Sequence, residues 1–381
     1  MNVKSESRGF IPVSEPSLDG NELKYLTECI ESGWVSSDGP FVARFEDALK
    51  SHVGREHAIA VSSGSAALDV AVTALGLGEG DEVILPAHTI ISCAQAISRT
   101  GASIVLVDTD LATWNMAIDQ IEAAITPRTA AIMVVHTFGL PTDIAQVKKI
   151  ADKHNLRIIE DAAQAIGVPC HGKQCGSFGD ISIFSFYPNK HITTGEGGMI
   201  FCDDPALAER CRSLKNLCFK PERRFVHDSI GWNYRMSNLN AAVGLAQYEK
   251  LPEHLARKRR VGEFYRELLC DIPEITLPPL DQDYAQNHYW VFGLLIDRAQ
   301  GLNADVVRTK LGSQGIGTRP FFWPIHLQPV YQKLGYFDNQ RYPIAEQICE
   351  YGFYIPSGVT LTNEDQKEIV KKIRATLSSK I

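Results

Sequence analysis

The chain has 381 residues, of which 44% are hydrophobic and 22% are charged, a composition typical of a folded globular protein with room for one large domain and a smaller one. Its net charge of −7 disfavours nucleic acid and anionic membranes as partners, so an anionic ligand would need local cations. No run of the sequence approaches the roughly 18 apolar residues of a membrane span.

The nine cysteines are scattered without CxxC pairs, and no clustered partner ligands accompany the closest two, Cys170 and Cys175. Reduced thiols in a cytoplasmic enzyme are therefore the better interpretation, and we expect no metal site. The first ten residues lack the apolar core of a signal peptide, which agrees with a cytoplasmic location.

Residues 1–20 form a polar arm ahead of two segments, 22–32 and 41–54, whose apolar residues recur at helical spacing. The segment between them, 33–39, is rich in glycine and serine and indicates a turn. Trp34 lies in this turn. Because a tryptophan is costly to expose, the turn is either a surface loop or one wall of a ligand pocket.

Residues 58–78 indicate a strand, a turn of small residues and a helix. Gly64 and Ser65 open that helix, and free backbone N–H groups together with the helix dipole favour a phosphate there. Ser63 and Ser65 are equally ordinary capping residues. The two interpretations share one geometry, because an N-cap turn is also an anion site.

Short apolar runs then alternate with helical segments, which is the pattern of a parallel sheet with right-handed crossovers. His136 ends one of these runs, where a core or capping role is about as strongly expected as a ligand contact. The predicted strands are 81–86, 103–108, 130–136, 156–161 and 179–186.

Two charged residues stand against apolar sequence in the middle of the chain. Asp161 closes a buried strand pattern, and α/β folds hold their ligands at this end of their strands. Lys190 follows a second such pattern, where desolvation would lower its pKa from about 10.4 and expose a nucleophilic amine. Separately, Asp161 could be a helix cap and Lys190 a surface lysine. Together they are the carboxylate and the lysine that pyridoxal phosphate requires, and they favour that cofactor.

The later part of the chain carries two polar segments. The charges of the basic segment 215–224 are either solvated or hold a diphosphate. Asn233 and Arg235 form a polar island before an alanine-rich helix.

We expect a domain boundary near Leu251, with a large domain at 1–250 that includes the N-terminal arm and a smaller α+β domain at 251–381. The smaller domain contains a loop rich in aromatic residues and proline, 318–326, and composition alone gives this loop no function.

As a set, the sequence motifs resemble the DegT-type family of nucleotide-sugar aminotransferases over nearly the whole chain, and within it they are most similar to those of GDP-perosamine synthases. The resemblance implies an α/β fold like that of aspartate aminotransferase (fold type I), with a mostly parallel sheet in the large domain. The motifs that carry it are IPVSEPSLDGNE (11–22), SGWVSSDG (32–39), EDAAQA (160–165), FSFYPNK (184–190), TTGEGGM (193–199), NYRMSN (233–238) and TRPFFWPIH (318–326).

The resemblance also implies roles for the candidate residues around the cofactor. Lys190 is the catalytic residue and forms the covalent bond to pyridoxal phosphate, while Asp161 keeps the pyridine nitrogen protonated. Gln164 would face the ring's phenolic oxygen from one helical turn further on. Ile90 stands where the family usually has a ring-stacking aromatic, and His88 could contribute to that contact. The expected phosphate contacts are Gly64, Ser65, Ser185 and, from the neighbouring subunit, Asn233.

The substrate contacts implied for the sugar and its diphosphate are more widely spread along the chain. They are Trp34, Ser36, Arg319, His326, Arg223 and Arg224. A homodimer with shared active sites is expected from the role of Asn233.

The implied reaction moves an amino group from L-glutamate to a nucleotide-linked 4-keto-6-deoxy sugar. GDP-4-keto-6-deoxymannose, giving GDP-perosamine for lipopolysaccharide O-antigen biosynthesis, is the first expectation. Sugars linked to dTDP or UDP stay open as alternatives, because Tyr187-Pro188 replaces the Phe-Gly pair usual in perosamine synthases, and Gln164 stands where those enzymes tend to have glutamate.

Two rival functions have less support. Sugar dehydratases of this fold replace the lysine with histidine, whereas this chain keeps Lys190, with His191 beside it. A cofactor-binding regulator would be expected to carry an appended DNA-binding segment, and the chain has neither spare length nor a basic domain.

Overall fold

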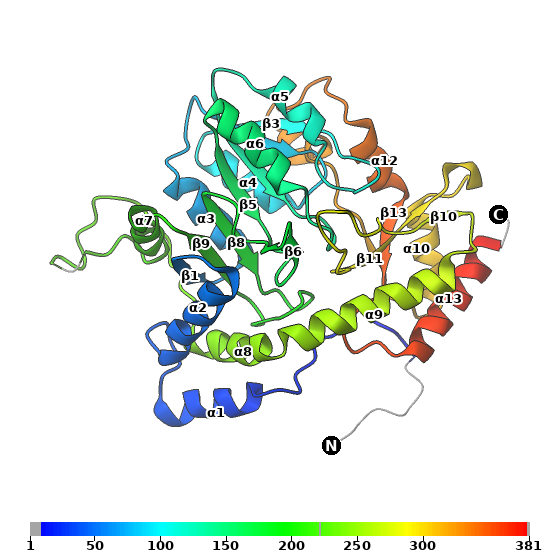
Figure 1. Ribbon diagram of the computed structural model, residues 1–381, viewed down its shortest axis with the longest axis horizontal. Helices are drawn as coiled ribbons and strands as arrows, with labels where there is room; N and C mark the ends of the chain where they lie inside the picture. Colours follow the sequence, from blue (N-terminus) through cyan, green and yellow to red (C-terminus); the bar gives the residue numbers. More distant parts are fainter. Residues whose placement is uncertain (1–8, 221, 379–381) are drawn as a thin grey trace.

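The computed structural model describes residues 9–220 and 222–378 (Figure 1). A seven-stranded sheet of order β1-β9-β8-β5-β4-β2-β3 forms its centre, and every strand except β9 runs in the same direction. This arrangement confirms the predicted α/β class. The strands are β1 (His57–Val61), β2 (Glu82–Pro86), β3 (Ser103–Val107), β4 (Thr129–Val135), β5 (Arg157–Asp161), β8 (Ile181–Ser185) and β9 (Gly198–Cys202).

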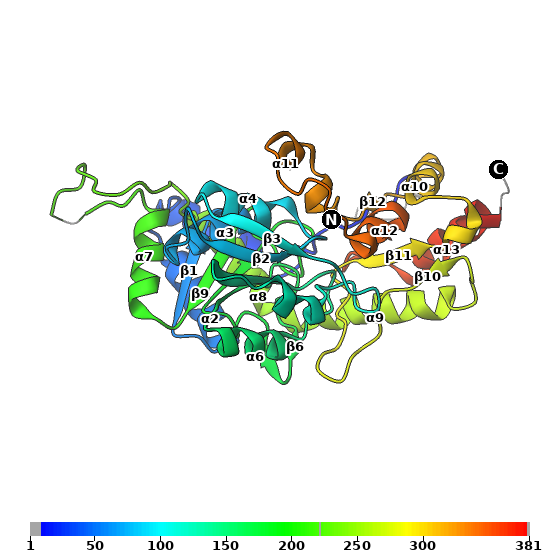
Figure 2. The same ribbon diagram turned by 90° about the horizontal axis from the view of Figure 1, so that it is seen from above.

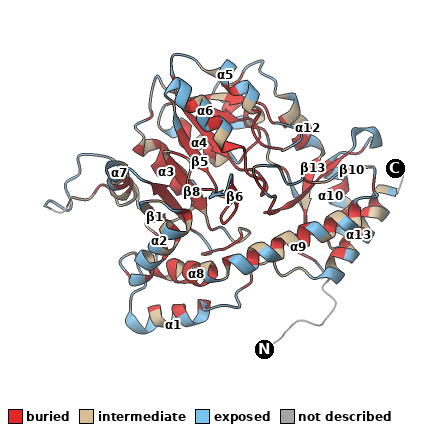
Figure 3. Cartoon of the chain, viewed as in Figure 1, coloured by how far each residue is buried: buried red, intermediate tan, exposed pale blue. Residues whose placement is uncertain are grey.

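Helices cover both faces of this sheet, which leaves its strands buried (Figure 3). Alternation along β4 shows why: Met133 faces one hydrophobic cluster, and its neighbours Ile132 and Val134 face the other. One face packs on α3 (Gly64–Ala74), α4 (Ile91–Arg99) and α7 (Pro205–Lys215), and the other on α2 (Pro40–Val53), α6 (Ile144–His154) and α8 (Asn238–Glu249), with α1 (Glu22–Ser32) outside α8.

A second, antiparallel sheet of order β10-β11-β13-β12 belongs to the C-terminal part of the chain. Its strands are β10 (Ile275–Thr276), β11 (Phe292–Ile296), β12 (Arg319–Pro320) and β13 (Gly352–Ile355), and it packs with α9 (Leu251–Leu269), α10 (Ala304–Ser313) and α13 (Asn363–Ser378). The long helix α9 extends from α8 toward this second sheet (Figure 1).

The remaining elements are short. They are α5 (Ile121–Ala124), α11 (Pro329–Lys333), α12 (Pro343–Tyr351), the hairpin β6 (Pro169–Cys170) and β7 (Lys173–Gln174), and the 3-10 helices at Ile118–Gln120, Arg298–Gln300 and Ile325–Leu327. Residues 222–230, which follow α7, are exposed and project beyond it (Figure 2).

Helix α9 begins at the expected domain boundary, but each of the two predicted domains contributes a segment that packs against the other domain. Ile11 of the N-terminal arm bridges to Ile316 and joins the hydrophobic cluster of the second sheet. In return, Ile325, Tyr331 and Ala345 belong to the cluster on one face of the seven-stranded sheet. The division at residues 250 and 251 therefore stays a prediction.

Among the described residues, none of the helices combines the length and apolar character that crossing a lipid bilayer requires.

Candidate active site

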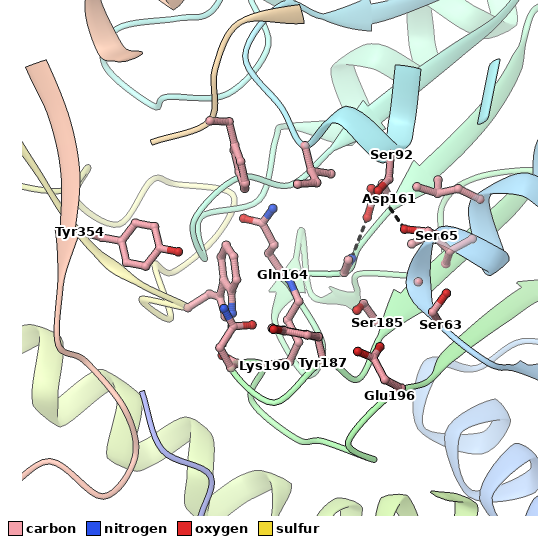
Figure 4. A pocket seen from close by; sticks show the side chains of 18 residues that line it. Ser63, Ser65, Ser92, Asp161, Gln164, Ser185, Tyr187, Lys190, Glu196 and Tyr354 are labelled. Atoms are coloured by element: carbon pink, nitrogen blue, oxygen red, sulfur yellow. Dashed lines mark hydrogen bonds between the residues drawn. The ribbon is translucent and has the colours of Figure 1, made fainter. Parts of the chain in front are cut away.

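A cavity of about 350 Å³ opens at the carboxyl ends of β5 and β8 (Figure 4). Side chains from both halves of the chain line it, which places it where the large sheet meets the second one. Seven of the residues predicted to bind cofactor line this cavity together, namely Gly64, Ser65, Ile90, Asp161, Gln164, Ser185 and Lys190.

Asp161 ends β5 and is buried in the cavity floor. Its Oδ1 accepts a hydrogen bond of 3.0 Å from the N–H of Ala163, and its Oδ2 accepts one of 3.1 Å from the thiol of Cys93. Burial raises the pKa of Asp161, and these two hydrogen bonds oppose the rise. The carboxylate can therefore hold the N–H of a cationic ring. No helix follows it, since residues 162–168 form turns, which corrects the expected helical position of Gln164.

Lys190 lies in a turn beyond β8 and points into the same cavity. Its Nζ lies 3.8 Å from the ring centroid of Trp290. Burial lowers the pKa of Lys190 to about 7, while the negative charge of Asp161 opposes that shift. An amine in this state can accept or donate a proton near neutral pH, and its neutral form is nucleophilic.

The N-terminus of α3 forms the end of the cavity suited to an anion. The Ser63 side chain caps the helix by accepting the N–H of Ala66 at 3.0 Å, and Ser65 Oγ lies 2.8 Å from Ser92 Oγ. Ser185 approaches so closely that a Cβ at Gly64 would lie 2.7 Å from its Cβ. The absence of that Cβ leaves backbone N–H groups and hydroxyls open to one ligand.

These donors fit pyridoxal phosphate. A carboxylate for the ring nitrogen, an amine for the carbonyl carbon and a helix N-terminus with hydroxyls for the phosphate all line one cavity. Gln164 adds to the fit, because its Oε1 accepts the N–H of Phe138 at 2.8 Å and leaves its NH₂ group for a ligand oxygen.

Aromatic side chains that were not predicted individually also line the cavity, one of them from the aromatic loop 318–326. Trp290 precedes β11, Phe322 follows β12 and Tyr354 belongs to β13. Ile90, which stands where the family usually has an aromatic residue, also lines the wall and is partly exposed. Apolar contacts to a cofactor ring could therefore come from Ile90 and from these aromatic side chains. The aromatic run around Trp290 in the sequence was the available signal for this wall.

The histidines near these residues do not line the cavity. His191 is buried on the other side of the turn that holds Lys190, where it lines a separate small cavity with Lys258. His136 is bonded to Glu160 at 3.1 Å and to the N–H of Thr142, which is a core role. His88 packs among aromatic rings, with Phe322 at a centroid distance of 5.8 Å.

Several predicted substrate residues lie outside the cavity. His326 is buried, is bonded to Glu346 at 3.1 Å and does not line this cavity, so its expected sugar contact stays a prediction. Arg319 is exposed on β12, directly opposite Tyr354 of the cavity wall. Trp34 and Ser36 lie on a mainly exposed turn. Their carbonyl oxygens accept hydrogen bonds of 2.7 Å each from Asn238.

A second cavity, of about 500 Å³, is lined by basic side chains from the end of α7 and the segment that follows it. Arg224 lines it, whereas the neighbouring Arg223 is exposed and does not. Asn233 is exposed, and its Oδ1 accepts a hydrogen bond of 2.9 Å from Arg235, another lining residue. Asn233 therefore does not reach the first cavity of its own chain. The other basic residues that line this second cavity are Arg212, Lys215 and Lys220.

Comparison with known proteins gives a consistent result. The DegT/DnrJ/EryC1/StrS aminotransferase family profile matches residues 16–374. The chain is 40% identical over 371 residues to the GDP-perosamine synthase of Escherichia coli O157:H7, covering 97% of this chain and 100% of that one. It is 40% identical over 367 residues to the GDP-perosamine synthase of Caulobacter vibrioides, covering 96% and 98%. The crystal structure of the aminotransferase TlmJ from Streptoalloteichus hindustanus matches with a TM-score of 0.90 and 30% identity, covering 97% and 99%.

Proposed function

The chain belongs to the DegT/DnrJ/EryC1/StrS aminotransferase family, and from this premise we propose that it is a pyridoxal-phosphate-dependent enzyme that converts GDP-4-keto-6-deoxymannose to GDP-perosamine with L-glutamate as amino donor. The structural observation that supports the proposal is one cavity that brings together Lys190, Asp161 and the N-terminus of α3. The named relatives support the choice of sugar nucleotide.

Pyridoxal phosphate, when bound, supplies an electron sink for removal of the proton from the donor's α-carbon. Lys190 would hold the cofactor covalently and then, as a free amine, carry that proton between donor and cofactor carbons. Its pKa of about 7 lets both protonation states be populated at neutral pH. Asp161 would hold the ring nitrogen's proton, and Ser65, Ser185 and the N–H groups at the start of α3 would hold the phosphate.

The position of Asn233 supports a homodimer with shared sites as part of this proposal. The side chain lies at the surface beside a basic cavity and outside the first cavity. A two-fold contact could present it, with Arg224 and Arg235, to the cofactor cavity of a second copy. These arginines would then supply the diphosphate of the substrate with local cations on a chain whose net charge is −7.

A dTDP- or UDP-linked 4-keto sugar is the second candidate substrate. The observation in its favour is Tyr187, which lines the cavity and is half exposed at its edge, in the Tyr-Pro pair that departs from the perosamine synthase pattern. The dehydratase alternative loses support, because Lys190 lines the cavity and His191 does not. A cytoplasmic role in O-antigen synthesis belongs to the same proposal as the perosamine product.

The test is single-turnover amination of a panel of GDP-, dTDP- and UDP-linked 4-keto sugars by protein preloaded with amino groups from L-glutamate. We expect GDP-4-keto-6-deoxymannose among the best two acceptors and no turnover by Lys190→Ala. If another nucleotide is clearly preferred, the perosamine assignment fails and the aminotransferase assignment stands. If the donor half-reaction fails in the wild type, both fail.

A further inference from the structure

Trp290 contacts the reactive amine directly. The residue comes just before β11, its side chain is buried, and its ring centroid lies 3.8 Å from Lys190 Nζ. An indole face is the aromatic surface that attracts a cation most strongly, and the attraction grows where water is excluded. The ring therefore favours the ammonium form of Lys190, whereas burial of the amine disfavours that form.

Hydrogen bonds hold Trp290 at its ring and at its backbone. Its Nε1–H donates a hydrogen bond of 2.9 Å to the carbonyl oxygen of Asn189, the residue before Lys190. Its own carbonyl oxygen accepts a hydrogen bond of 2.8 Å from Lys258 of α9, which also donates to the carbonyl oxygen of Ser357. Lys258 is buried, and burial lowers its pKa to about 7. Burying a lysine costs free energy that hydrogen bonds must offset. Here the two hydrogen bonds to backbone carbonyls also fix the segment that carries Trp290.

Other titratable groups also act on the amine. Burial lowers the pKa of Lys190 to about 7, and the negative charge of Asp161 opposes that shift. Lys258 lies behind the turn that holds Lys190 and lines the small cavity there. The remaining titratable groups around the two cavities that Lys190 lines are Tyr187, Glu196, Tyr354, His191, His254 and Glu15.

We propose that Trp290 is a positioning residue for Lys190, whose indole face holds the ammonium form of the amine and whose Nε1–H fixes the backbone at Asn189. The tryptophan keeps the amine beside the reacting carbons when it is not bound to the cofactor. This role deepens the proposed function and rests on it, because it matters for catalysis only if Lys190 is the proton carrier.

The test measures the titration of Lys190 in cofactor-free protein by brief labelling with acetic anhydride across pH, with the labelled peptides quantified by mass spectrometry. Exposed Lys149 of the same chain is the internal reference. In Trp290→Leu and Trp290→Met, which lack an aromatic face, we expect the midpoint of Lys190 to fall by about one pH unit. Trp290→Phe keeps a face and loses the Nε1–H. Its midpoint should stay within about 0.3 units of the wild type, with a several-fold lower kcat.

An unchanged midpoint in a folded Leu or Met variant would overturn the proposal, and so would equal shifts in the Phe, Leu and Met variants. Thermal unfolding identifies which variants are folded. Either of the two non-aromatic variants suffices, and the Phe variant tests the ring face against a purely structural role. The labelling needs neither cofactor nor sugar, so failure of the amination panel leaves its outcome unaffected, and the reverse also holds.

Discussion

Glu160 and Asp161 are consecutive buried carboxylates at the end of β5 whose pKa values are shifted in opposite directions. Burial raises the pKa of both. At Glu160 the hydrogen bond from His136 and those from further donors outweigh burial, so the pKa of Glu160 is lowered. At Asp161 the hydrogen bonds from Ala163 and Cys93 are too weak to offset burial, so the pKa of Asp161 stays raised. The pleat of the strand explains the difference, because successive side chains point to opposite faces, one into the core and one into the cavity.

Replacing Glu160 should destabilise the fold in a pH-dependent way. Its carboxylate accepts hydrogen bonds from His136 Nε2, Ser182 Oγ and three backbone N–H groups. Glu160→Gln should cost about 3 kcal/mol at pH 7, lowering Tm by on the order of 5 °C. A depressed folded-state pKa gives stability that is present above the unfolded-state pKa and is lost as pH falls through the folded-state value. The Tm difference between variant and wild type should therefore shrink below about pH 4.5, and a difference that stays constant would contradict the assignment.

Replacing Asp161 should have the opposite effect on stability. A raised folded-state pKa means that the charged carboxylate costs stability in cofactor-free protein once pH rises through that value. We expect Asp161→Asn to unfold at the wild-type temperature or slightly above it at pH 7, while cofactor binding and turnover are lost. Calorimetry must be done without the cofactor, since a ligand of the native state adds its own stabilisation. Strong destabilisation of this variant would contradict the prediction.

Cys93 should tune the proton affinity of Asp161. Its thiol is buried, and burial together with the charge of Asp161 raises the pKa of Cys93 well above its usual value, so the thiol remains a donor. Removing this donor in Cys93→Ala should raise the pKa of Asp161 further. Cofactor affinity can be measured by absorbance as a function of pH. The pH at which it falls on the acid side should then rise by about half a unit. Cys93→Ser restores a donor and should stay near the wild-type curve or below it. Coincident curves for all three proteins would disprove the effect.

Gly64 should be required for phosphate binding because Ser185 packs too closely against it to leave room for a side chain. An added Cβ would lie 2.7 Å from the Cβ of Ser185. Gly64→Ala should therefore weaken binding of pyridoxal phosphate by about tenfold or more, equivalent to about 1.4 kcal/mol. Gly312→Ala is the matched control, since nothing lies within 4 Å of the added Cβ in α10. Equal cofactor affinity of the Gly64→Ala protein and its control, measured by titration, would rule out this role.

Asn233 should complement Lys190 across a dimer. Lys190→Ala and Asn233→Asp should each be inactive, the second because a carboxylate would repel the phosphate. A hybrid dimer would contain one site with both residues intact. Mixing the two proteins should restore up to about a quarter of wild-type activity, on the simple expectation that hybrids form half of a randomly exchanged population and carry one good site each. No recovery after subunit exchange, verified by native mass spectrometry, would contradict a site that uses Lys190 of one chain and Asn233 of the other.

The features that could be predicted from the sequence are those that follow from local patterns of residues. Periodicity predicted five strands of the sheet, with ends within two residues of the observed ones, and the helix at Glu22–Ser32. The small residues around Gly64 indicated the anion-binding turn, and the apolar settings of Asp161 and Lys190 indicated the cofactor. These signals are local, because strand alternation, helix capping and the loss of water around a charge depend on neighbours along the chain.

The tertiary structure alone decided which distant side chains meet. Trp290 reaches Lys190 from a position 100 residues later, and Cys93 meets Asp161 across 68 residues, with no pattern in the sequence to connect either pair. The direction of a side chain was also beyond the sequence, since His191 does not line the cofactor cavity that its neighbour Lys190 lines. The physical reason is that packing two sheets and their connecting loops selects these contacts through shape and burial summed over the whole chain, which no short segment encodes.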